Sequence, residues 1–188
     1  MKTGNIFVVS APSGAGKTTL CKRVLANNPG LSYSVSHTTR APRNNEKHGV
    51  DYFFITAEAF EKGIQEKRWA EWAMVHGNFY GTSLDFIKER VTSGSNLLLD
   101  IDVQGAEQIK SNFPAAVTIF IMAPSVDVLE HRLLSRKTDT EAVIQNRLIN
   151  ARKEIARKGF YDHVIVNDDL EKAVRELDTI VQTPGEGC

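Results

Sequence analysis

The stretch that decides the fold is Ser-Ala-Pro-Ser-Gly-Ala-Gly-Lys-Thr-Thr, residues 10–19. It follows an apolar run at residues 6–9, which is typical of a buried strand, and it precedes residues 18–25, which have the pattern of a helix. A strand, a glycine-rich turn, a Lys-Thr pair and a helix, in this order, are the features of a phosphate-binding P-loop. The alternative is a chance glycine turn, which does not account for the strand, the Lys-Thr pair and the helix together.

Each part of this loop has chemistry that suits phosphate. Gly14 and Gly16 let the backbone curl so that consecutive N–H groups point at one anion. The positive end of the following helix dipole adds to that field. Lys17 is placed to reach outer phosphates, and the Thr18 hydroxyl is a ligand for Mg²⁺. A strict P-loop begins with glycine where this chain has Ala11, an exchange of small cost unless that residue needs a positive φ.

The composition of the chain limits the classes of protein to which it can belong. The chain has 188 residues, 41% of them hydrophobic, which suits one domain with an inserted lobe. Its 23 basic and 23 acidic residues balance, which argues against broad attraction to nucleic acid or membrane. The two cysteines make no disulfide framework, and no apolar run reaches the ~18 residues of a membrane span. The start of the chain leads directly into a strand, so we expect no signal peptide and a cytoplasmic location.

The pattern predicts an α/β fold. Four short apolar runs are predicted as strands of a parallel sheet covered on both faces, at residues 6–9, 97–101, 117–122 and 163–166. Helical patterns lie between and after them, at residues 18–25, 103–111, 126–135, 141–156 and 170–181. Strands that alternate with helices imply right-handed βαβ crossovers.

Residues 32–80 differ from this pattern. They contain short strand-like pieces at 33–36, 52–55 and 72–76 and a short helix at 57–66. We expect a small mixed lobe inserted between the first and second parallel strands. The polar and basic stretch at 134–141 is the candidate for a lid.

Two arginines three residues apart, Arg40 and Arg43, stand beside a proline in Thr-Thr-Arg-Ala-Pro-Arg. Paired guanidinium groups bind phosphate through bidentate contacts. A solvated basic loop is the alternative. Phosphoryl transfer needs a phosphate donor and an acceptor, so a chain with a P-loop needs a second anion site. We therefore prefer the hypothesis that Arg40 and Arg43 form that site.

The aromatic motifs that follow contain one carboxylate of interest. Tyr52 and Tyr80 have hydroxyls that donate to phosphate oxygens, although such rings are more often part of a core. Glu71 lies between two tryptophans, and a carboxylate in apolar surroundings needs a donor partner. The alternative is that Glu71 faces solvent on an alternating strand.

Acidic residues end the strand predicted at 97–101. Ligands of open α/β sheets bind beyond the carboxyl ends of strands, so Asp100 is placed to orient Mg²⁺ and its waters. Asp102 is instead able to cap the helix that begins at Val103. We assign Asp100 to the metal, together with Thr18, partly through water.

The lid region and the last strand supply further candidates. Arg132 and Arg136 are four apart, on one helical face, and Arg147 follows on the next helix, so all three are candidates to close over a transferring phosphate. Surface ion pairs with Glu130 or Glu141 are the alternative. After the strand at 163–166, Asn167 is placed to approach a nucleotide base, and Asp168 or Asp169 to cap the final helix.

The chain resembles the guanylate kinase family, whose members phosphorylate GMP with ATP. The resemblance rests on Ser-Ala-Pro-Ser-Gly-Ala-Gly-Lys-Thr, Val-Ser-His-Thr-Thr-Arg-Ala-Pro-Arg, Gly-Val-Asp-Tyr-Phe-Phe, Glu-Trp-Ala, Gly-Asn-Phe-Tyr-Gly-Thr, Leu-Asp-Ile-Asp-Val-Gln-Gly-Ala and Val-Ile-Val-Asn-Asp-Asp. These motifs occur in family order over nearly the whole chain. The resemblance implies a P-loop nucleoside monophosphate kinase fold, with a core at 1–34, 85–125 and 155–188, a GMP-binding lobe at 35–84 and a helical lid at 126–154.

The resemblance also implies the site residues. The guanine of GMP would lie among Ser36, Glu71, Thr82 and Asp102, and its phosphate among Arg40, Arg43, Tyr52 and Tyr80. ATP would be bound by the loop and one asparagine, that is by Ala11, Pro12, Ser13, Gly14, Ala15, Gly16, Lys17, Thr18, Thr19 and Asn167. The groups implied in catalysis are Lys17, Arg40, Arg43, Arg132, Arg136 and Arg147.

The implied reaction is ATP + GMP → ADP + GDP, with dGMP as a second acceptor and Mg²⁺ as the metal. The implied partners are these small molecules, with no nucleic acid and no membrane, and self-association into a homo-oligomer stays open. Two other readings stay open as well. One is a non-catalytic guanylate-kinase-like module that binds phosphopeptides, and the other is a related kinase of a phosphorylated sugar.

Overall fold

The computed structural model describes residues 3–75, 77–135 and 140–183. Within these ranges the chain forms two compact units. The first comprises residues 3–6 and 30–116, and the second comprises residues 7–29 and 117–183. The predicted class, α/β with parallel strands flanked by helices, is confirmed.

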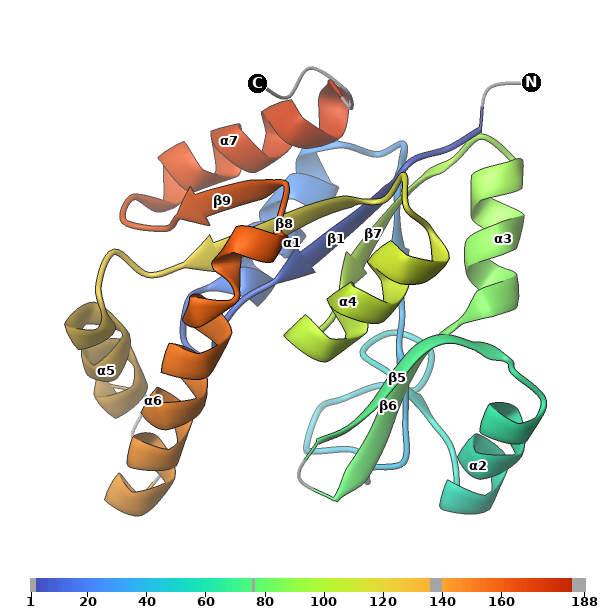
Figure 1. Ribbon diagram of the computed structural model, residues 1–188, viewed down its shortest axis with the longest axis horizontal. Helices are drawn as coiled ribbons and strands as arrows, with labels where there is room; N and C mark the ends of the chain where they lie inside the picture. Colours follow the sequence, from blue (N-terminus) through green and yellow to red (C-terminus); the bar gives the residue numbers. More distant parts are fainter. Residues whose placement is uncertain (1–2, 76, 136–139, 184–188) are drawn as a thin grey trace. The chain divides into compact units, whose positions relative to one another are not determined.

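The second unit is built on parallel strands. Strand β8 pairs on one side with β1 and on the other with β9, in parallel register throughout. Residues 7–9 of β1 and 119–121 of β8 are fully buried, as their unbroken apolar sequence predicts. In Figure 1, β8 and β9 lie side by side and α7 runs beside β9. The elements of this unit are β1 (Ile6–Ser10, of which all but the first residue belong to the unit), α1 (Lys17–Asn27), β8 (Val117–Met122), α5 (Val126–Ser135), α6 (Glu141–Ala156), a 3₁₀ turn (Lys158–Phe160), β9 (His163–Val166) and α7 (Leu170–Gln182).

The first unit holds a parallel strand pair and a smaller sheet. Strands β2 and β7 are parallel, and Leu97 of β7 donates its N–H to the Asn5 carbonyl, just before β1. The smaller sheet has the strand order β4-β3-β6-β5 and is mixed, because β3 is parallel to β4 and antiparallel to β6. The elements of this unit are β2 (Leu31–Ser34), β3 (His37–Thr38), β4 (Phe53–Phe54), α2 (Ala57–Gln65), β5 (Trp69–Val75), β6 (Asn78–Ser83), α3 (Leu84–Thr92), β7 (Asn96–Asp100) and α4 (Val103–Asn112).

One strand was assigned to the wrong sheet. The sequence predicts a strand at 33–36 within the inserted lobe, whereas β2 begins at Leu31 and is paired in parallel with β7. Its sequence, Leu-Ser-Tyr-Ser, lacks the continuous apolar run of the other parallel strands. Only Leu31 and Ser34 of β2 are buried, which explains why the strand tolerates so many polar atoms.

Several other bounds differ from the prediction. Strand β5 begins three residues earlier than expected, β4 is shorter, and α3, β3 and β6 were not predicted. Helix α3 begins where Ser83 accepts the Phe86 N–H, a cap that its hydroxyl provides. Residue 76, the predicted end of the strand at 72–76, lies outside the described residues.

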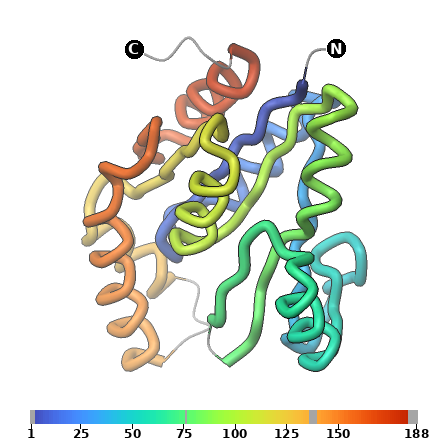
Figure 2. The backbone as a smooth tube through the Cα atoms, turned by 45° about the vertical axis from the view of Figure 1, so that its right-hand side comes forward, coloured from blue at the N-terminus to red at the C-terminus, as the bar shows by residue number. Residues whose placement is uncertain are grey.

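An aromatic stack joins α2 to the β5–β6 hairpin. The Phe60 ring stacks on Trp69 at 4.4 Å and on Phe79 at 5.0 Å between ring centroids. The Trp69 indole also donates to the Phe60 carbonyl at 3.1 Å, so its polar N–H is satisfied. Figure 2 shows α2 beside this hairpin. The stack is the core of the lobe that carries several candidate site residues.

Among the residues described, no helix has both the length and the apolar character needed to cross a membrane.

Replacing Phe60 by Ala tests this core. Phe60 is fully buried, so we expect Phe60→Ala to lower the free energy of unfolding by about 3–5 kcal/mol. The matched control is Phe160→Ala, whose ring is 38% exposed and which we expect to cost about 1 kcal/mol or less. Urea denaturation of both variants measures the difference, and equal costs would contradict the assignment of Phe60 to the core.

Candidate active site

The glycine-rich loop occupies residues 11–16, between the last residue of β1 and the first residue of α1. Gly14 and Gly16 have φ values of 93° and 96°, in the left-handed region that glycine adopts without strain. Ala11 is not among the residues with positive φ, so the absence of glycine there costs little. The strand, loop and helix of the predicted phosphate site are confirmed.

The glycine-rich loop is held by a hydrogen bond from Asn167, the residue that follows β9. The Asn167 Nδ2 donates to the Ala15 carbonyl at 2.8 Å, and both residues are buried. A Cβ on Gly16 would collide with this same Nδ2 atom. Gly16 is therefore required both for its backbone conformation and for the space that the Asn167 amide occupies.

Two of the three lid-side arginines are hydrogen-bonded within this unit. Arg132 Nη2 donates to the Asn167 carbonyl at 2.9 Å, so α5 is linked to the residue that holds the loop. Arg147 Nη1 donates to Ser13 Oγ at 3.2 Å, which places the α6 arginine at the loop itself. Arg136 lies outside the described residues.

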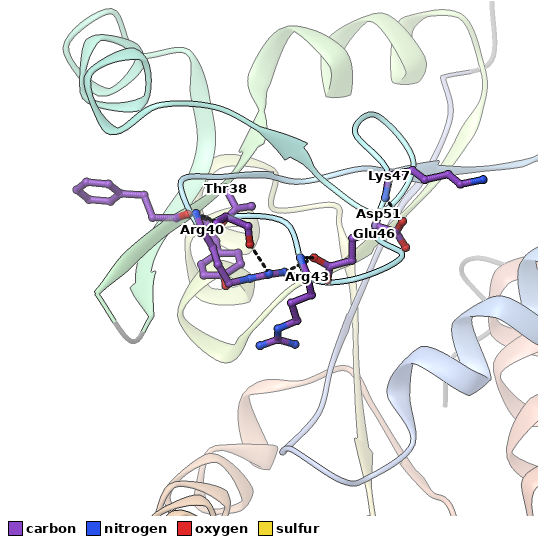
Figure 3. A network of polar contacts seen from close by, with 9 residues as sticks. Thr38, Arg40, Arg43, Glu46, Lys47 and Asp51 are labelled. Carbon is purple, nitrogen blue, oxygen red and sulfur yellow. Dashed lines mark hydrogen bonds and ion pairs between the residues drawn. The ribbon is translucent and has the colours of Figure 1, made fainter. Parts of the chain in front are cut away.

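The first unit contains a second cluster of cationic and aromatic groups (Figure 3). Arg40 Nε donates to the Tyr80 hydroxyl at 3.2 Å, and its guanidinium carbon lies 5.5 Å from the centre of the Tyr52 ring. The Tyr52 and Tyr80 rings meet edge to face at 5.9 Å. Three of the four residues predicted at the GMP phosphate are thus in mutual contact.

A carboxylate that the sequence analysis did not single out, Glu46, belongs to this cluster. Arg40 Nη2 donates to both Glu46 oxygens, at 2.9 and 3.0 Å, and the Arg43 backbone N–H donates to Glu46 Oε2 at 2.7 Å. The hydrogen bond from Arg40 lowers the pKa of Glu46, and the bond from the Arg43 N–H adds to that effect. The same contact with Glu46 raises the pKa of Arg40.

Arg43 itself is exposed, and Figure 3 shows its side chain pointing away from Glu46. Within the described part of the chain its guanidinium group makes no hydrogen bond or ion pair. Its donors are therefore available to an anion from solution. The alternative of a wholly solvated basic loop fits Arg43 but not Arg40, which is 15% exposed.

Glu71 is buried in the structure. It is 4% exposed and accepts a hydrogen bond from the Thr82 hydroxyl at 2.5 Å, directly across the β5–β6 hairpin. A bulge between Trp69 and Glu71 shifts the register so that the carboxylate points to the covered face. The alternative of a solvent-facing Glu71 is wrong.

Helix α4 leaves room for this carboxylate at Gly105. A Cβ there would lie 2.7 Å from Glu71 Oε2, so any other residue would push the carboxylate away. Gln108 of the same helix bonds the Trp72 backbone on both sides, through Oε1 at 3.1 Å and Nε2 at 2.8 Å. These contacts fix α4 along β5, beside Glu71.

Asp102 caps α4, as one of the two sequence hypotheses predicted. Its Oδ1 accepts the Gly105 N–H at 2.7 Å, which satisfies one donor of the first turn of α4. Ser36 lies just before β3, where its carbonyl accepts the Phe53 N–H at 2.9 Å. The cap predicted at Asp168 or Asp169 belongs to Asp169, which accepts the Lys172 N–H at 2.8 Å.

The residues assigned to Mg²⁺ have donors of the right kind. Thr18 lies exposed in the first turn of α1, and Asp100 is the last residue of β7. Hydroxyl and carboxylate oxygens suit Mg²⁺, which binds through one or two protein ligands, several waters and substrate phosphates. Over the described ranges no three histidine, cysteine, aspartate or glutamate side chains gather into a metal cage. Thr18 of the second unit and Asp100 of the first unit thus each offer an oxygen donor of a kind that suits Mg²⁺.

His37, within the Ser-His-Thr-Thr-Arg motif, is a packing residue. Its ring stacks on Phe53 at 4.7 Å and lies 4.9 Å from Trp69. Burial lowers its pKa, and the nearby His48 and Arg68 lower it further. His37 is therefore neutral at pH 7 and adds no charge to the arginine cluster.

A glycine-rich loop between a buried parallel strand and a helix, on alternating strands and helices, defines the class of P-loop phosphotransferases. Comparison with known proteins then gives the family. The sequence matches the guanylate kinase family over residues 3–184. It is 51% identical to a guanylate kinase of Syntrophotalea carbinolica, over 100% of this chain and 88% of that protein. It is 48% identical to one from Fusobacterium nucleatum subsp. nucleatum, over 97% and 98%.

The crystal structure of guanylate kinase from Anaplasma phagocytophilum is also similar, with a TM-score of 0.78 and 34% sequence identity. The match covers 97% of this chain and 86% of that one. The chain belongs to the guanylate kinase family.

Replacing Gly16 by Ala tests the packing of the loop. Positive φ costs an L-residue roughly 1–2 kcal/mol, and the collision with Asn167 adds to it, so we expect Gly16→Ala to weaken ATP binding more than tenfold. Gly77→Ala is the matched control, because Gly77 has a φ of 77° but nothing within 4 Å of a Cβ. Calorimetric titration with ATP checks both. The loop assignment fails if the two variants bind ATP equally well.

Proposed function

We propose that the chain carries out the reaction of its family, ATP-dependent phosphorylation of GMP to GDP, by direct in-line transfer with each nucleotide bound by a separate unit. The single observation that supports it most is the buried Glu71 carboxylate, held by Thr82 in the same unit as the arginine cluster. A buried carboxylate selects a base with paired donors, and the arginines select its phosphate.

Guanine recognition follows from hydrogen-bond chemistry. Guanine presents N1–H and the exocyclic NH₂ side by side, and one carboxylate accepts both. Adenine lacks this donor pair and would leave Glu71 buried without a donor from the base, a mismatch that rejects a substrate strongly. Thr82 fixes the carboxylate, and Ser36 and Asp102 are assigned to the remaining base edge.

The phosphate of GMP is assigned to Arg40, Arg43, Tyr52 and Tyr80. Arg43 has donors available, and Arg40 is held against both tyrosines by the contacts described above. Guanidinium donors match phosphate oxygens in bidentate geometry, which the exposed Arg43 group is able to offer. None of the assigned residues is required to bind the ribose 2′-hydroxyl, so we extend the proposal to dGMP.

ATP is assigned to the second unit. The loop from Ala11 to Thr19 offers its N–H groups and the N-terminus of α1 to the phosphates, and Lys17 follows at the first helical position. Asn167 is assigned near adenine in addition to its contact with the loop. Thr18 and Asp100 would hold Mg²⁺, which neutralises charge on the phosphates when bound.

The residues of the chain act by placing charge, not by forming a covalent intermediate. Lys17, Arg40 and Arg43 offset the repulsion between two anionic nucleotides and the charge that develops on the transferred group. Arg132, Arg136 and Arg147 are assigned to the same role from the lid side. Exclusion of water from the bound nucleotides would favour transfer to GMP over hydrolysis.

The division into a core, a GMP-binding lobe at 35–84 and a lid at 126–154 stays a prediction, as does a cytoplasmic location. The presence of Lys17 and Thr18 directly after the glycine-rich loop favours an enzyme over a non-catalytic module. Glu71 with Tyr52 and Tyr80 favours GMP over a sugar phosphate.

Replacing Glu71 by Gln tests the guanine assignment. Glutamine offers one acceptor and one donor where guanine needs two acceptors, so we expect kcat/KM for GMP to fall by about 100-fold while KM for ATP is unchanged. The control is Glu61→Gln on the exposed face of α2, which we expect to have wild-type kinetics. Equal losses for GMP and ATP would count against a base-recognition role.

Replacing Lys17 by Met tests the donor side. The variant loses a cation at the outer phosphates, so kcat is expected to fall by about 10²–10³-fold, with GMP affinity within about threefold of wild type. Lys22→Met, an exposed position later in the same helix, is the matched control. Steady-state assays with ATP and Mg²⁺, read as ADP release, measure both, and an unchanged kcat for Lys17→Met would refute the assignment.

A further inference from the structure

The Glu46 carboxylate is an acidic group in a cluster of residues that is assigned to bind an anion. It engages the Arg40 guanidinium through both oxygens, at 2.9 and 3.0 Å, and the pair is only 15% and 19% exposed. A carboxylate so close to a phosphate site would repel the phosphate, so its presence there needs a second explanation. The backbone hydrogen bonds of Glu46 provide one.

Glu46 stabilises the turn of the loop that carries Arg40 and Arg43. Its Oε2 accepts the Arg43 N–H at 2.7 Å, while its own N–H donates to the Arg43 carbonyl at 3.1 Å. The turn passes through Asn45, whose φ of 75° lies in the left-handed region that asparagine tolerates better than most residues. Glu46 thus fixes the backbone of Arg43 and the side chain of Arg40 at once.

The remaining contacts of Arg40 show what this fixation achieves. Nε is bonded to the Tyr80 hydroxyl and Nη1 to the Ala41 carbonyl at 2.8 Å, so oxygens surround the guanidinium on three edges. The plane of the group is therefore set before a substrate arrives. Such preorganisation lowers the entropy that binding must overcome.

We propose that Glu46 is a positioning residue for the phosphate of the nucleoside monophosphate, acting through Arg40 and the Arg43 backbone. The proposal rests on the assignment of that phosphate to Arg40 and Arg43. Glu46 itself does not touch the substrate. The hydrogen bonds of Glu46 go to Arg40 and to the Arg43 backbone, not to Glu71 or Thr82, so its contribution concerns the phosphate and not the base.

The test compares a ligand with a phosphate and a ligand without one. We expect Glu46→Ala to raise KM for GMP about tenfold, since the pair keeps some exposure to water, with KM for ATP and the inhibition constant of guanosine unchanged. Glu46→Gln retains an acceptor oxygen without the charge, so we expect a smaller rise. Glu66→Ala is the matched control, because Glu66 pairs with Arg68 at 2.9 Å in the same unit, and we expect no change.

A further comparison separates positioning from loop folding alone. Asp51 accepts the Lys47 N–H at 2.8 Å and holds the other side of this loop without touching Arg40. We expect Asp51→Ala to have a smaller effect on KM for GMP than Glu46→Ala. Equal effects would overturn the proposal, because they would reduce Glu46 to one more loop contact.

The remaining outcomes are also decisive. An unchanged KM for GMP in Glu46→Ala overturns the proposal, and a lowered KM does so too, since it would make Glu46 a competitor of phosphate for Arg40. Equal loss of guanosine and GMP binding would show a general structural role and overturn it as well. If Glu46→Ala does not fold, Glu46→Gln decides by the same criteria. Arg40→Ala separates failure of the Glu46 proposal from failure of the phosphate assignment. If this variant also leaves KM for GMP unchanged, the assignment of the phosphate to Arg40 fails.

Discussion

A long cationic side chain binds an anion at a lower entropic cost when it is already held in place, and oxygen atoms of this protein hold three of the arginines proposed to bind phosphate. Arg40 is held by Glu46, Tyr80 and Ala41, Arg132 by the Asn167 carbonyl, and Arg147 by Ser13. Each of these bonds fixes a long side chain that would otherwise lose rotamer freedom on binding. The glycine-rich loop is also held in place before a ligand binds, by the hydrogen bond from the Asn167 side-chain amide to the Ala15 carbonyl.

The two units apply this constraint in different ways. The anion site proposed in the second unit is mainly backbone, since a loop and a helix N-terminus provide N–H groups without mobile charge. The anion site proposed in the first unit is made of side chains, and aromatic rings and a carboxylate keep Arg40 in position. A backbone site suits a polyphosphate common to many nucleotides. A side-chain site next to a buried carboxylate suits one particular monophosphate, because base and phosphate are then recognised together.

The elements that could be predicted from sequence were those with a local signal. The P-loop followed from the order of strand, glycines, Lys-Thr and helix, and the strands β1, β7, β8 and β9 followed from apolar runs. The expectation that all four are covered on both faces is wrong for β9, where Val164 and Val166 are exposed and only Ile165 is buried. β2 was assigned to the wrong sheet because Leu-Ser-Tyr-Ser has no such run, and its place depends on pairing with β7, more than 60 residues away. Glu46 was not singled out because an acidic residue in a basic loop has no local signature. Only the folded turn brings it to Arg40.

Gly105 has a consequence for protein engineering. Glycine inside a helix costs roughly 0.5–1 kcal/mol relative to alanine, so exchange for alanine is a common route to thermostable variants. In α4 that route is closed, because the added methyl group would meet the Glu71 carboxylate at 2.7 Å. The helix gives up some intrinsic stability to leave space for a charged group on a neighbouring strand. Any substitution at position 71, the residue proposed to select guanine, must therefore be designed together with position 105, since the two residues share one volume.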